Sequence, residues 1–138
     1  MILIIGGAYQ GKSEYAKEKY GGSICSCTDS RIDTSFDIIE HLEIFSLSCV
    51  KMSLNPRDEI KKYADELKDK ILICDDISQG VVPMDKTLRV WREENGRMLS
   101  DLSKRADKVI RIFCGLPQVI KDYPTEINLM HTPREILP

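Results

Sequence analysis

The feature that most constrains the fold is an eight-residue glycine-containing loop near the start of the chain. Residues 6–13 fit the pattern G-x-x-x-x-G-K-[ST] in full, and they follow the continuous apolar run Met1–Ile5. Such a run is typical of a strand that is covered on both faces of a parallel sheet. A predicted helix over Lys12–Tyr20, ended by Gly21 and Gly22, comes directly after the loop. The order of strand, loop and helix is the context in which this pattern holds phosphate.

Each part of the loop predicts a contact with a nucleotide. Gly6 and Gly11 allow a tight turn in which several backbone N–H groups converge on phosphate oxygens. Lys12 adds a catalytic positive charge at the β and γ phosphates, and the Ser13 hydroxyl is a candidate ligand of Mg²⁺. We expect ATP or GTP as substrate and Mg²⁺ as cofactor. The predicted nucleotide-binding residues are Gly6, Gly7, Ala8, Tyr9, Gln10, Gly11, Lys12 and Ser13.

Strand and helix signals alternate along the rest of the chain. This alternation favours an α/β fold of the P-loop type, a three-layer sandwich with a mostly parallel sheet. Further strands are predicted over residues 23–28, 71–74 and 109–114, and further helices over 32–52, 55–69 and 85–105. We expect one nucleotide-binding domain over residues 1–121 and an extended tail with three prolines over residues 122–138.

The composition is that of one ordinary globular domain. The 138 residues are 42% hydrophobic and carry a net charge of −2, which gives no support to nucleic-acid binding. No apolar run reaches the ~18 residues of a membrane span, and no basic leader precedes the first apolar run, so we expect a cytoplasmic protein. The five cysteines lack metal-ligand spacing and are expected to be buried or half-buried free thiols.

Two adjacent acids end the predicted strand over residues 71–74. A phosphate loop needs an acid at the end of a neighbouring strand to hold Mg²⁺ through water, and both Asp75 and Asp76 are candidates. Because side chains alternate along a strand, only one is expected to face the metal. Asp76 is the first candidate for the catalytic role, and Asp75 is the second. The alternative interpretation is an aspartate that caps a loop.

The segments that follow these acids form a specific series. An acid–Ile–Ser–Gln–Gly–Val–Val–Pro segment leads into a long helix with Gly-Arg in its middle, and the last predicted strand begins after an Ala-Asp pair and ends at Gly-Leu-Pro. The segments are residues 76–83, 96–97, 106–109 and 114–117.

With the phosphate loop, this series resembles the adenosylcobinamide kinase / adenosylcobinamide-phosphate guanylyltransferase family of cobalamin biosynthesis. The resemblance extends over about residues 1–20 and 71–121, and Ser78 and Pro117 stand where the family usually has glycine. It implies phosphoryl transfer to a hydroxyl on the side chain of a corrinoid, adenosylcobinamide, and a homo-oligomer.

The family's second activity, guanylyl transfer, uses a histidine in a longer middle segment. We expect residues 29–70 to be too short for the family's extra strand and helix, which places this activity in doubt. His41 is the one histidine before the tail, at the border of a predicted apolar helix face. It is either a structural residue or a nucleophile or phosphate contact. His131 lies in the predicted tail.

Other basic and aromatic side chains leave alternatives open. Arg89, Arg92 and Arg97 form either a solvated helix face or contacts with phosphate or a second subunit, and Trp91 is expected in a core or an interface. Two other functions also fit the pattern. One is a P-loop kinase of another small molecule, and the other is a nucleotide-binding module without catalysis.

Overall fold

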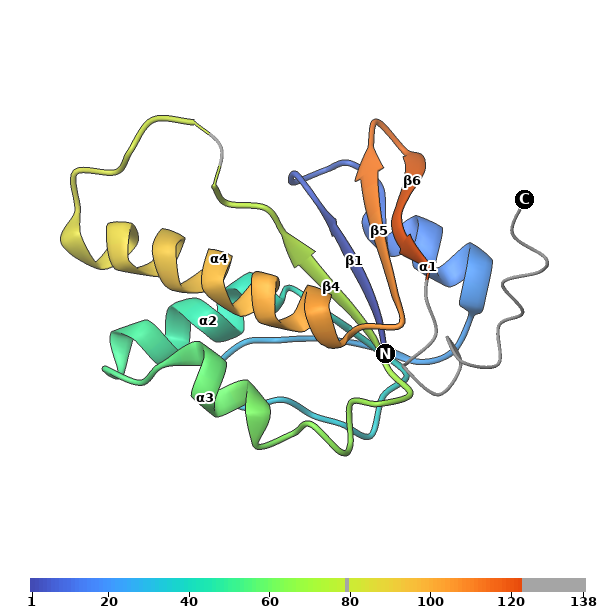
Figure 1. The fold of residues 1–138 in the computed structure, drawn as a ribbon, viewed down its shortest axis with the longest axis horizontal. Helices are drawn as coiled ribbons and strands as arrows, with labels where there is room; N and C mark the ends of the chain where they lie inside the picture. The colour runs from blue at the N-terminus through green and yellow to red at the C-terminus, as the bar shows by residue number, and fades with distance from the viewer. Residues whose placement is uncertain (79, 123–138) are drawn as a thin grey trace.

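The computed structural model describes residues 1–78 and 80–122, which form a six-stranded sheet flanked by helices (Figure 1). The strands are β1 (Ile2–Gly6), β2 (Ile24–Ser26), β3 (Ile38–Glu40), β4 (Ile71–Asp75), β5 (Lys108–Phe113) and β6 (Leu116–Asp122). The helices are α1 (Lys12–Tyr20), α2 (Leu42–Lys51), α3 (Pro56–Lys61) and α4 (Lys86–Arg105).

The sheet has the order β2-β3-β4-β1-β5-β6. The first five strands are parallel, and β6 pairs antiparallel with β5. The prediction of an α/β fold with a mostly parallel sheet is therefore confirmed. The order also places β4 directly beside β1, with Gly6 opposite Asp75 in the register. The end of the acid-bearing strand thus lies next to the start of the glycine-containing loop.

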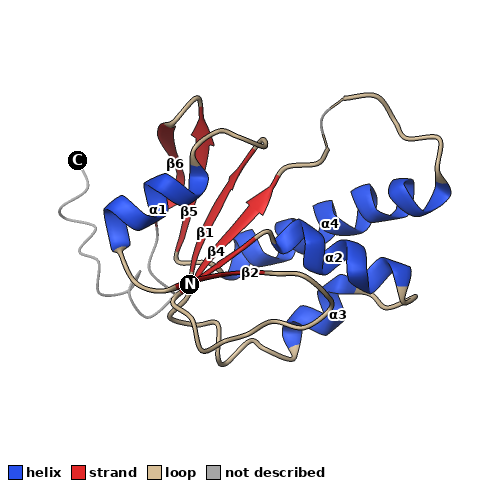
Figure 2. Cartoon of the chain, turned by 180° about the vertical axis from the view of Figure 1, so that it is seen from behind, coloured by secondary structure: helices blue, strands red, loops and turns tan. Residues whose placement is uncertain are grey.

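Two hydrophobic cores cover the two faces of the sheet. On one face α1 packs through Ala16 against Ile4, Ile73 and Ile110. On the other face α2, α3 and α4 pack together against the remaining side chains of the same strands (Figure 2). The alternation is plain in β1, where Leu3 belongs to the second core and Ile4 to the first. The continuous apolar run over Met1–Ile5 follows from this double coverage.

Local signals fix the starts of two helices. The side chain of Asn55 accepts a hydrogen bond from the Arg57 N–H, and Pro56 occupies the first turn of α3. Asp85 caps α4 in the same way, with its side chain accepting from the Leu88 N–H at 3.1 Å. The helix predicted over 55–69 is shorter than expected, because α3 ends at Lys61 and turns lead from there to β4.

The helix predicted over residues 32–52 is wrong in its first half. Residues 38–40 form β3, and the helix α2 begins only at Leu42. The apolar residues Ile38, Leu42 and Phe45 have helical spacing, but Ile38 belongs to the core under α1 whereas Leu42 and Phe45 belong to the opposite core. Residues 29–70 therefore contain one strand, β3, and two helices, α2 and α3.

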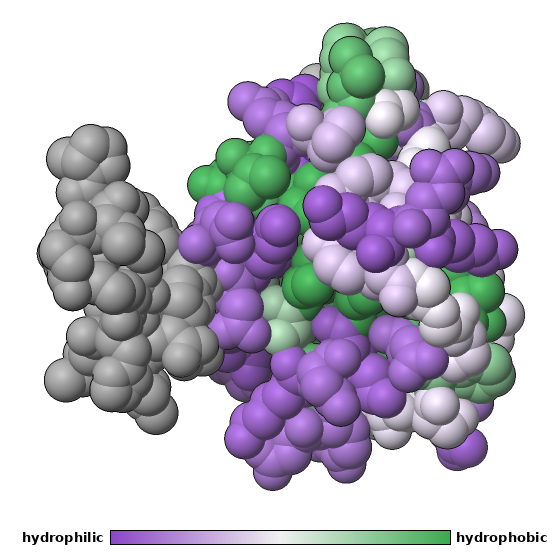
Figure 3. Space-filling model, turned by 90° about the vertical axis from the view of Figure 1, so that its right-hand side faces the viewer, coloured by the Kyte–Doolittle hydropathy of each residue, from purple (hydrophilic) through white to green (hydrophobic). Residues whose placement is uncertain are grey.

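The strand β6 was not predicted. It carries Pro117 and forms one edge of the sheet, where the missing N–H of proline is tolerated. Phe113, Leu116, Val119 and Ile120 of this hairpin are exposed. Figure 3 shows apolar surface interrupting the polar surface on the side of the molecule that carries α1 and β6. The predicted tail begins at Asp122, the last residue of β6, and its residues 123–138 lie outside the described part of the chain.

All five cysteines are free thiols, as predicted, but their burial differs. Cys27, Cys49 and Cys74 are buried, Cys25 is half-buried, and Cys114 is exposed in the β5–β6 turn, contrary to expectation. Burial raises the pKa of the Cys27 thiol to about 12. Among the described residues, no helix is long and apolar enough to cross a membrane.

Candidate functional site

The glycine-containing loop joins the end of β1 to the start of α1. A Cβ atom on Gly6 would lie 2.5 Å from the Ile112 carbonyl oxygen, so β1 and β5 can approach here only at a glycine. Gly11 has a φ of 89° and ends the loop where α1 begins. Tyr9 also has a positive φ, of 60°, and its side chain is fully exposed. The backbone is therefore held in the tight turn that the pattern predicts.

Lys12 is buried, although lysine is rarely buried without a partner. Its Nζ donates to the Gly7 carbonyl oxygen at 2.6 Å and lies 2.7 Å from Oδ1 of Asp75. Asp75 is the last residue of β4, directly beside β1 in the sheet. The sheet order thus delivers a carboxylate to the lysine of the loop.

Of the two adjacent acids, the structure brings Asp75, the second candidate, to the lysine of the loop, whereas Asp76, the first candidate, contacts the segment that follows β4. Asp76 begins the segment after β4, where its Oδ1 accepts hydrogen bonds from the Ser78 N–H and hydroxyl at 2.9 and 2.6 Å. Its own N–H donates to the Gly6 carbonyl oxygen at 2.8 Å. Alternation along the strand separates the two side chains, as expected, and Asp76 caps the turn that follows.

Glu40 is a second acid at this edge, and the sequence analysis missed it. The Ser13 hydroxyl donates to Oε2 of Glu40 at 3.1 Å. Glu40 ends β3, next to β4 in the sheet, as Asp75 ends β4. The signal was an acid directly after a short apolar pair, Ile38 and Ile39, but it is readable only once β3 is recognised as a strand.

His41 lies between β3 and α2 and not inside a helix. It has a left-handed backbone, with φ 58° and ψ 45°, and its side chain is half exposed. Its Nδ1 lies 3.0 Å from Oε2 of Glu43. Burial lowers the pKa of His41, but the hydrogen bond and charge of Glu43 raise it, with further contributions from Glu40 and Asp75, and the net pKa is above the usual value.

Glu43 is a buried acid that links three elements. Its Oε1 accepts from the Asp75 N–H at 2.9 Å, while its Oε2 holds the His41 ring. The backbone carbonyl of Glu43 accepts from the indole N–H of Trp91 on α4 at 2.9 Å. Trp91 therefore packs α4 against α2, which agrees with its predicted place in a core. His41, Glu43 and Asp75 form a cluster that could ligate a metal, but all three have partners within the protein.

One cavity of about 440 Å³ contains the residues above. Its lining consists of Ala8, Tyr9, Gln10, Gly11, Lys12, Ser13, Glu14, Lys17, Glu40, His41, Ile73 and Asp75. Two lysines and three carboxylates give this lining a net charge of −1 with the histidine neutral. Hydroxyl and carboxylate oxygens of Ser13, Glu40 and Asp75 are ligands of the type that Mg²⁺ prefers. A bound cation would also offset the repulsion between these acids and a triphosphate.

The three arginines of α4 lie elsewhere. Arg89 donates to the carbonyl oxygens of Pro83 and Met84, and Arg92 donates to those of Ser78, Gly80 and Val81. Arg97 pairs with Glu93 and Glu94 on its own helix. Arg89 and Arg92 therefore fix the segment before α4, a role that was not predicted, and none of the three lines the cavity.

Comparison with known families identifies the chain. The family model described as cobinamide kinase / cobinamide phosphate guanyltransferase matches residues 39–120, which is more than half of the chain. The chain belongs to this family. The resemblance predicted from the sequence is confirmed. A search of the curated proteins gives no match.

The matched region begins inside β3 and ends inside β6. It includes Glu40, His41 and Asp75, and it excludes the phosphate loop. The family is one of enzymes that act on cobinamide and its phosphate in cobalamin biosynthesis and use nucleoside triphosphates. In this family member the loop and the matched region meet at the cavity, through the Lys12–Asp75 and Ser13–Glu40 contacts.

Proposed function

We propose that this protein transfers the γ-phosphoryl group of ATP or GTP to a hydroxyl on the side chain of adenosylcobinamide. The observation that carries the proposal is the ion pair between buried Lys12 and half-buried Asp75, 2.7 Å apart, in the cavity formed by the phosphate loop. Membership of the cobinamide kinase / cobinamide phosphate guanyltransferase family supports the reaction class and the acceptor.

The ion pair gives each partner a role that changes when a nucleotide binds. Lys12 is the cation of the loop, and a triphosphate would compete with Asp75 for its Nζ, because both are anions. Once Lys12 contacts the β and γ phosphates, the carboxylate of Asp75 is released toward the cavity. It is then available to accept a proton from the acceptor hydroxyl.

The proposed transfer is a single displacement. The acceptor oxygen forms a bond to the γ-phosphorus, and its proton passes to the carboxylate of Asp75. The bond between the γ-phosphorus and the bridging oxygen breaks, and the nucleoside diphosphate leaves with the electron pair. Lys12 and the backbone N–H groups of residues 6–13 stabilise the charge on the phosphate oxygens.

Mg²⁺ fits the oxygen donors at the cavity, and Ser13, Asp75 and Glu40 would hold it directly or through water. When bound, Mg²⁺ neutralises phosphate charge and fixes the orientation of the triphosphate. Glu40 contributes in a second way, because its hydrogen bond orients the Ser13 hydroxyl at 3.1 Å. His41 presents the ring edge that Glu43 does not hold, and we assign it a contact with the nucleotide phosphates.

A product assay tests the proposal. The purified protein is incubated with adenosylcobinamide, Mg²⁺ and either ATP or GTP, and mass spectrometry measures the phosphorylated corrinoid. The Asp75→Asn variant should bind nucleotide but form little product. Lys19→Ala, an exposed lysine of α1 outside the cavity, serves as the matched control.

Each other outcome points to a different function. Nucleotide binding without product from adenosylcobinamide, but with phosphorylation of another alcohol, would indicate a kinase of a different small molecule. Nucleotide binding without any transfer would indicate a non-catalytic module. Absence of nucleotide binding would contradict the assignment of the phosphate loop itself.

A further inference from the structure

A second cavity lies at the amino ends of the parallel strands, whereas the phosphate loop lies at their carboxyl ends. It has a volume of about 320 Å³ and is lined by Met1, Ala64, Leu67, Lys68, Leu102, Arg105 and Asp107. Met1 precedes β1, Lys68 precedes β4, and Arg105 ends α4, so the lining belongs to the amino ends of the strands. The two cavities share no lining residue. We call this second cavity the distal pocket.

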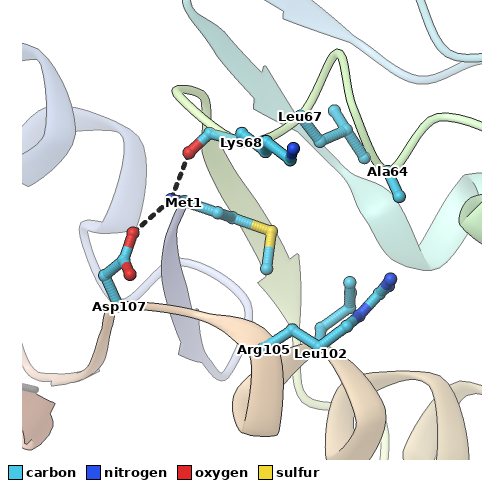
Figure 4. Close-up of a pocket in the computed structure, with 7 residues that line it drawn as sticks. All are labelled: Met1, Ala64, Leu67, Lys68, Leu102, Arg105 and Asp107. Carbon is cyan, nitrogen blue, oxygen red and sulfur yellow. Dashed lines mark hydrogen bonds and ion pairs between the residues drawn. The ribbon is translucent and has the colours of Figure 1, made fainter. Parts of the chain in front are cut away.

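The walls of the distal pocket are apolar. Leu67 and Leu102 belong to the main hydrophobic core and are buried, and Met1 packs against that core. Figure 4 shows the side chains of Leu67 and Ala64 on one side and Leu102 on the other, with the thioether of Met1 pointing between them. An apolar group in this space would be removed from water on several sides, which favours binding.

The mouth of the pocket is positively charged. The carboxylate of Asp107 is 2.9 Å from the amino group of Met1, which offsets its negative charge. Figure 4 shows Asp107 on the far side of Met1 from Leu102. Lys68 has one ion-pair partner within the described residues, Asp65 at 3.3 Å, and both side chains of that pair are exposed. Surface pairs of this type are weak.

Arg105 is the strongest indication of a ligand. It is exposed at the end of α4, and within residues 1–78 and 80–122 its guanidinium makes no ion pair and donates no hydrogen bond. Figure 4 shows it beside Leu102, on the side of the pocket opposite Lys68. A guanidinium binds a carboxylate through two parallel hydrogen bonds. A carboxylate on an apolar body therefore matches both the walls and the mouth.

We propose that the distal pocket binds a small amphiphilic carboxylate, with its apolar body against Leu67 and Leu102 and its carboxylate at Arg105 and Lys68. The volume lies near the lower end of the ~300–1,000 Å³ of ordinary ligand sites, so the ligand is small. This site is separate from the phosphate loop and does not depend on the reaction proposed above.

Calorimetry with octanoate tests the charge requirement. Octanoate should bind one site per chain saturably, and its neutral analogue octanamide should bind at least about tenfold more weakly, as expected for loss of a charge-assisted hydrogen bond. Arg105→Gln should weaken octanoate binding by a similar factor. Arg97→Gln is the matched control, because Arg97 is an exposed arginine on the same helix that does not line the pocket.

A second variant tests the apolar walls. Ala64→Phe places a ring in the pocket and should abolish octanoate binding while ATP binding persists, which also shows that the variant is folded. The proposal is overturned if octanoate fails to saturate, if octanamide binds equally well, or if Arg105→Gln and Arg97→Gln behave alike. It is also overturned if excess ATP displaces octanoate, because the ligand would then occupy the phosphate loop.

Discussion

The parallel strands have two ends, which differ in charge and in backbone conformation. We call the side of the sheet where these strands end the carboxyl edge, and the side where they begin the amino edge. The carboxyl edge carries the ion pair of Lys12 and Asp75. Among the described residues, three of the four non-glycine residues with positive φ lie there, directly after strands or in the phosphate loop: Tyr9, His41 and Cys114. The amino edge carries the apolar walls of the distal pocket.

This difference teaches how the strand order creates the site. Strands β3, β4 and β1 are neighbours, so the residues that end them, Glu40, Asp75 and the loop after Gly6, converge although they are far apart in sequence. Unusual backbone conformations cost free energy and persist where the surroundings enforce them. The comparison therefore predicts that changes at the amino edge affect stability, whereas changes at the carboxyl edge affect nucleotide chemistry.

The largest expected effect is at the amino edge. Leu102→Ala removes a fully buried side chain and should lower the free energy of unfolding by about 2–5 kcal/mol, because it leaves a cavity in the core. Chemical denaturation measures this loss, and calorimetry below the transition should show unchanged ATP affinity. Leu99→Ala, at a half-buried position on the same helix, should cost less. A large fall in ATP affinity of the folded Leu102→Ala protein would break the division between the edges.

The next effect concerns the two adjacent acids. Asp75→Asn should lower turnover by roughly 10²-fold or more, a magnitude typical of the loss of a general base. Nucleotide affinity without Mg²⁺ should not fall, because Lys12 loses a competing anion. Asp76→Asn is the matched control and should affect turnover much less. If Asp76→Asn causes the greater loss of turnover, the role assigned to Asp75 is wrong.

The loop and its acids show how far the sequence predicted this site. The pattern over residues 6–13 and the acid pair at the end of β4 were readable because each directly follows a continuous apolar run. Which acid faces the loop depends on the register of β4 with β1, which no local pattern specifies.

The acid Glu40 was missed for a different reason. The strand β3 has three residues, and its Ile38 falls into helical phase with Leu42 and Phe45 of α2. The spacing of apolar residues alone does not distinguish one long helix from a short strand followed by a helix, even when the strand and the helix bury their side chains on opposite faces of the sheet. Likewise, β6 was missed because its pattern is not that of a strand with one buried face, and its hairpin leaves Val119 and Ile120 exposed.

Lys12→Ala tests whether the phosphate loop at the carboxyl edge binds nucleotide. It should weaken binding of ATP and GTP by about 10- to 100-fold, as expected for loss of a charged hydrogen-bond donor, while the fold persists. Calorimetry gives the affinity, and circular dichroism the fold. Lys19→Ala, on the exposed side of α1, should bind normally. Equal affinities in wild type and Lys12→Ala would remove the phosphate loop from the proposed function.

A smaller effect is expected at the lateral edge of the sheet, which belongs to neither of the two edges compared above. The strand β6 exposes Leu116, Val119 and Ile120, and the resemblance to the family implied a homo-oligomer. We expect light scattering to give a particle larger than the 15.8 kDa chain, and Ile120→Glu to reduce its mass. Thr87→Glu, on the exposed start of α4, is the control. A 15.8 kDa particle for the wild type at micromolar concentration would contradict the prediction.

The smallest expected effect concerns His41, for which we predict no stable covalent GMP adduct after incubation with GTP and Mg²⁺. His41 does line the cavity, so access alone would permit attack on a phosphate. However, Glu43 holds its Nδ1 at 3.0 Å, and the surrounding acids raise the pKa of the ring above its usual value. A raised pKa keeps the ring protonated to a higher pH, and the protonated ring is not a nucleophile.

Intact-mass spectrometry decides between the two roles of His41. We expect the GTP-treated wild type to retain its mass, and His41→Ala to bind nucleotide a few-fold more weakly, as expected for loss of one polar contact. Glu43→Gln keeps a hydrogen-bond partner for the ring but removes the charge that raises the pKa. A mass increase of one GMP in the wild type that is absent in His41→Ala would show that the carboxyl edge supports guanylyl transfer through this histidine.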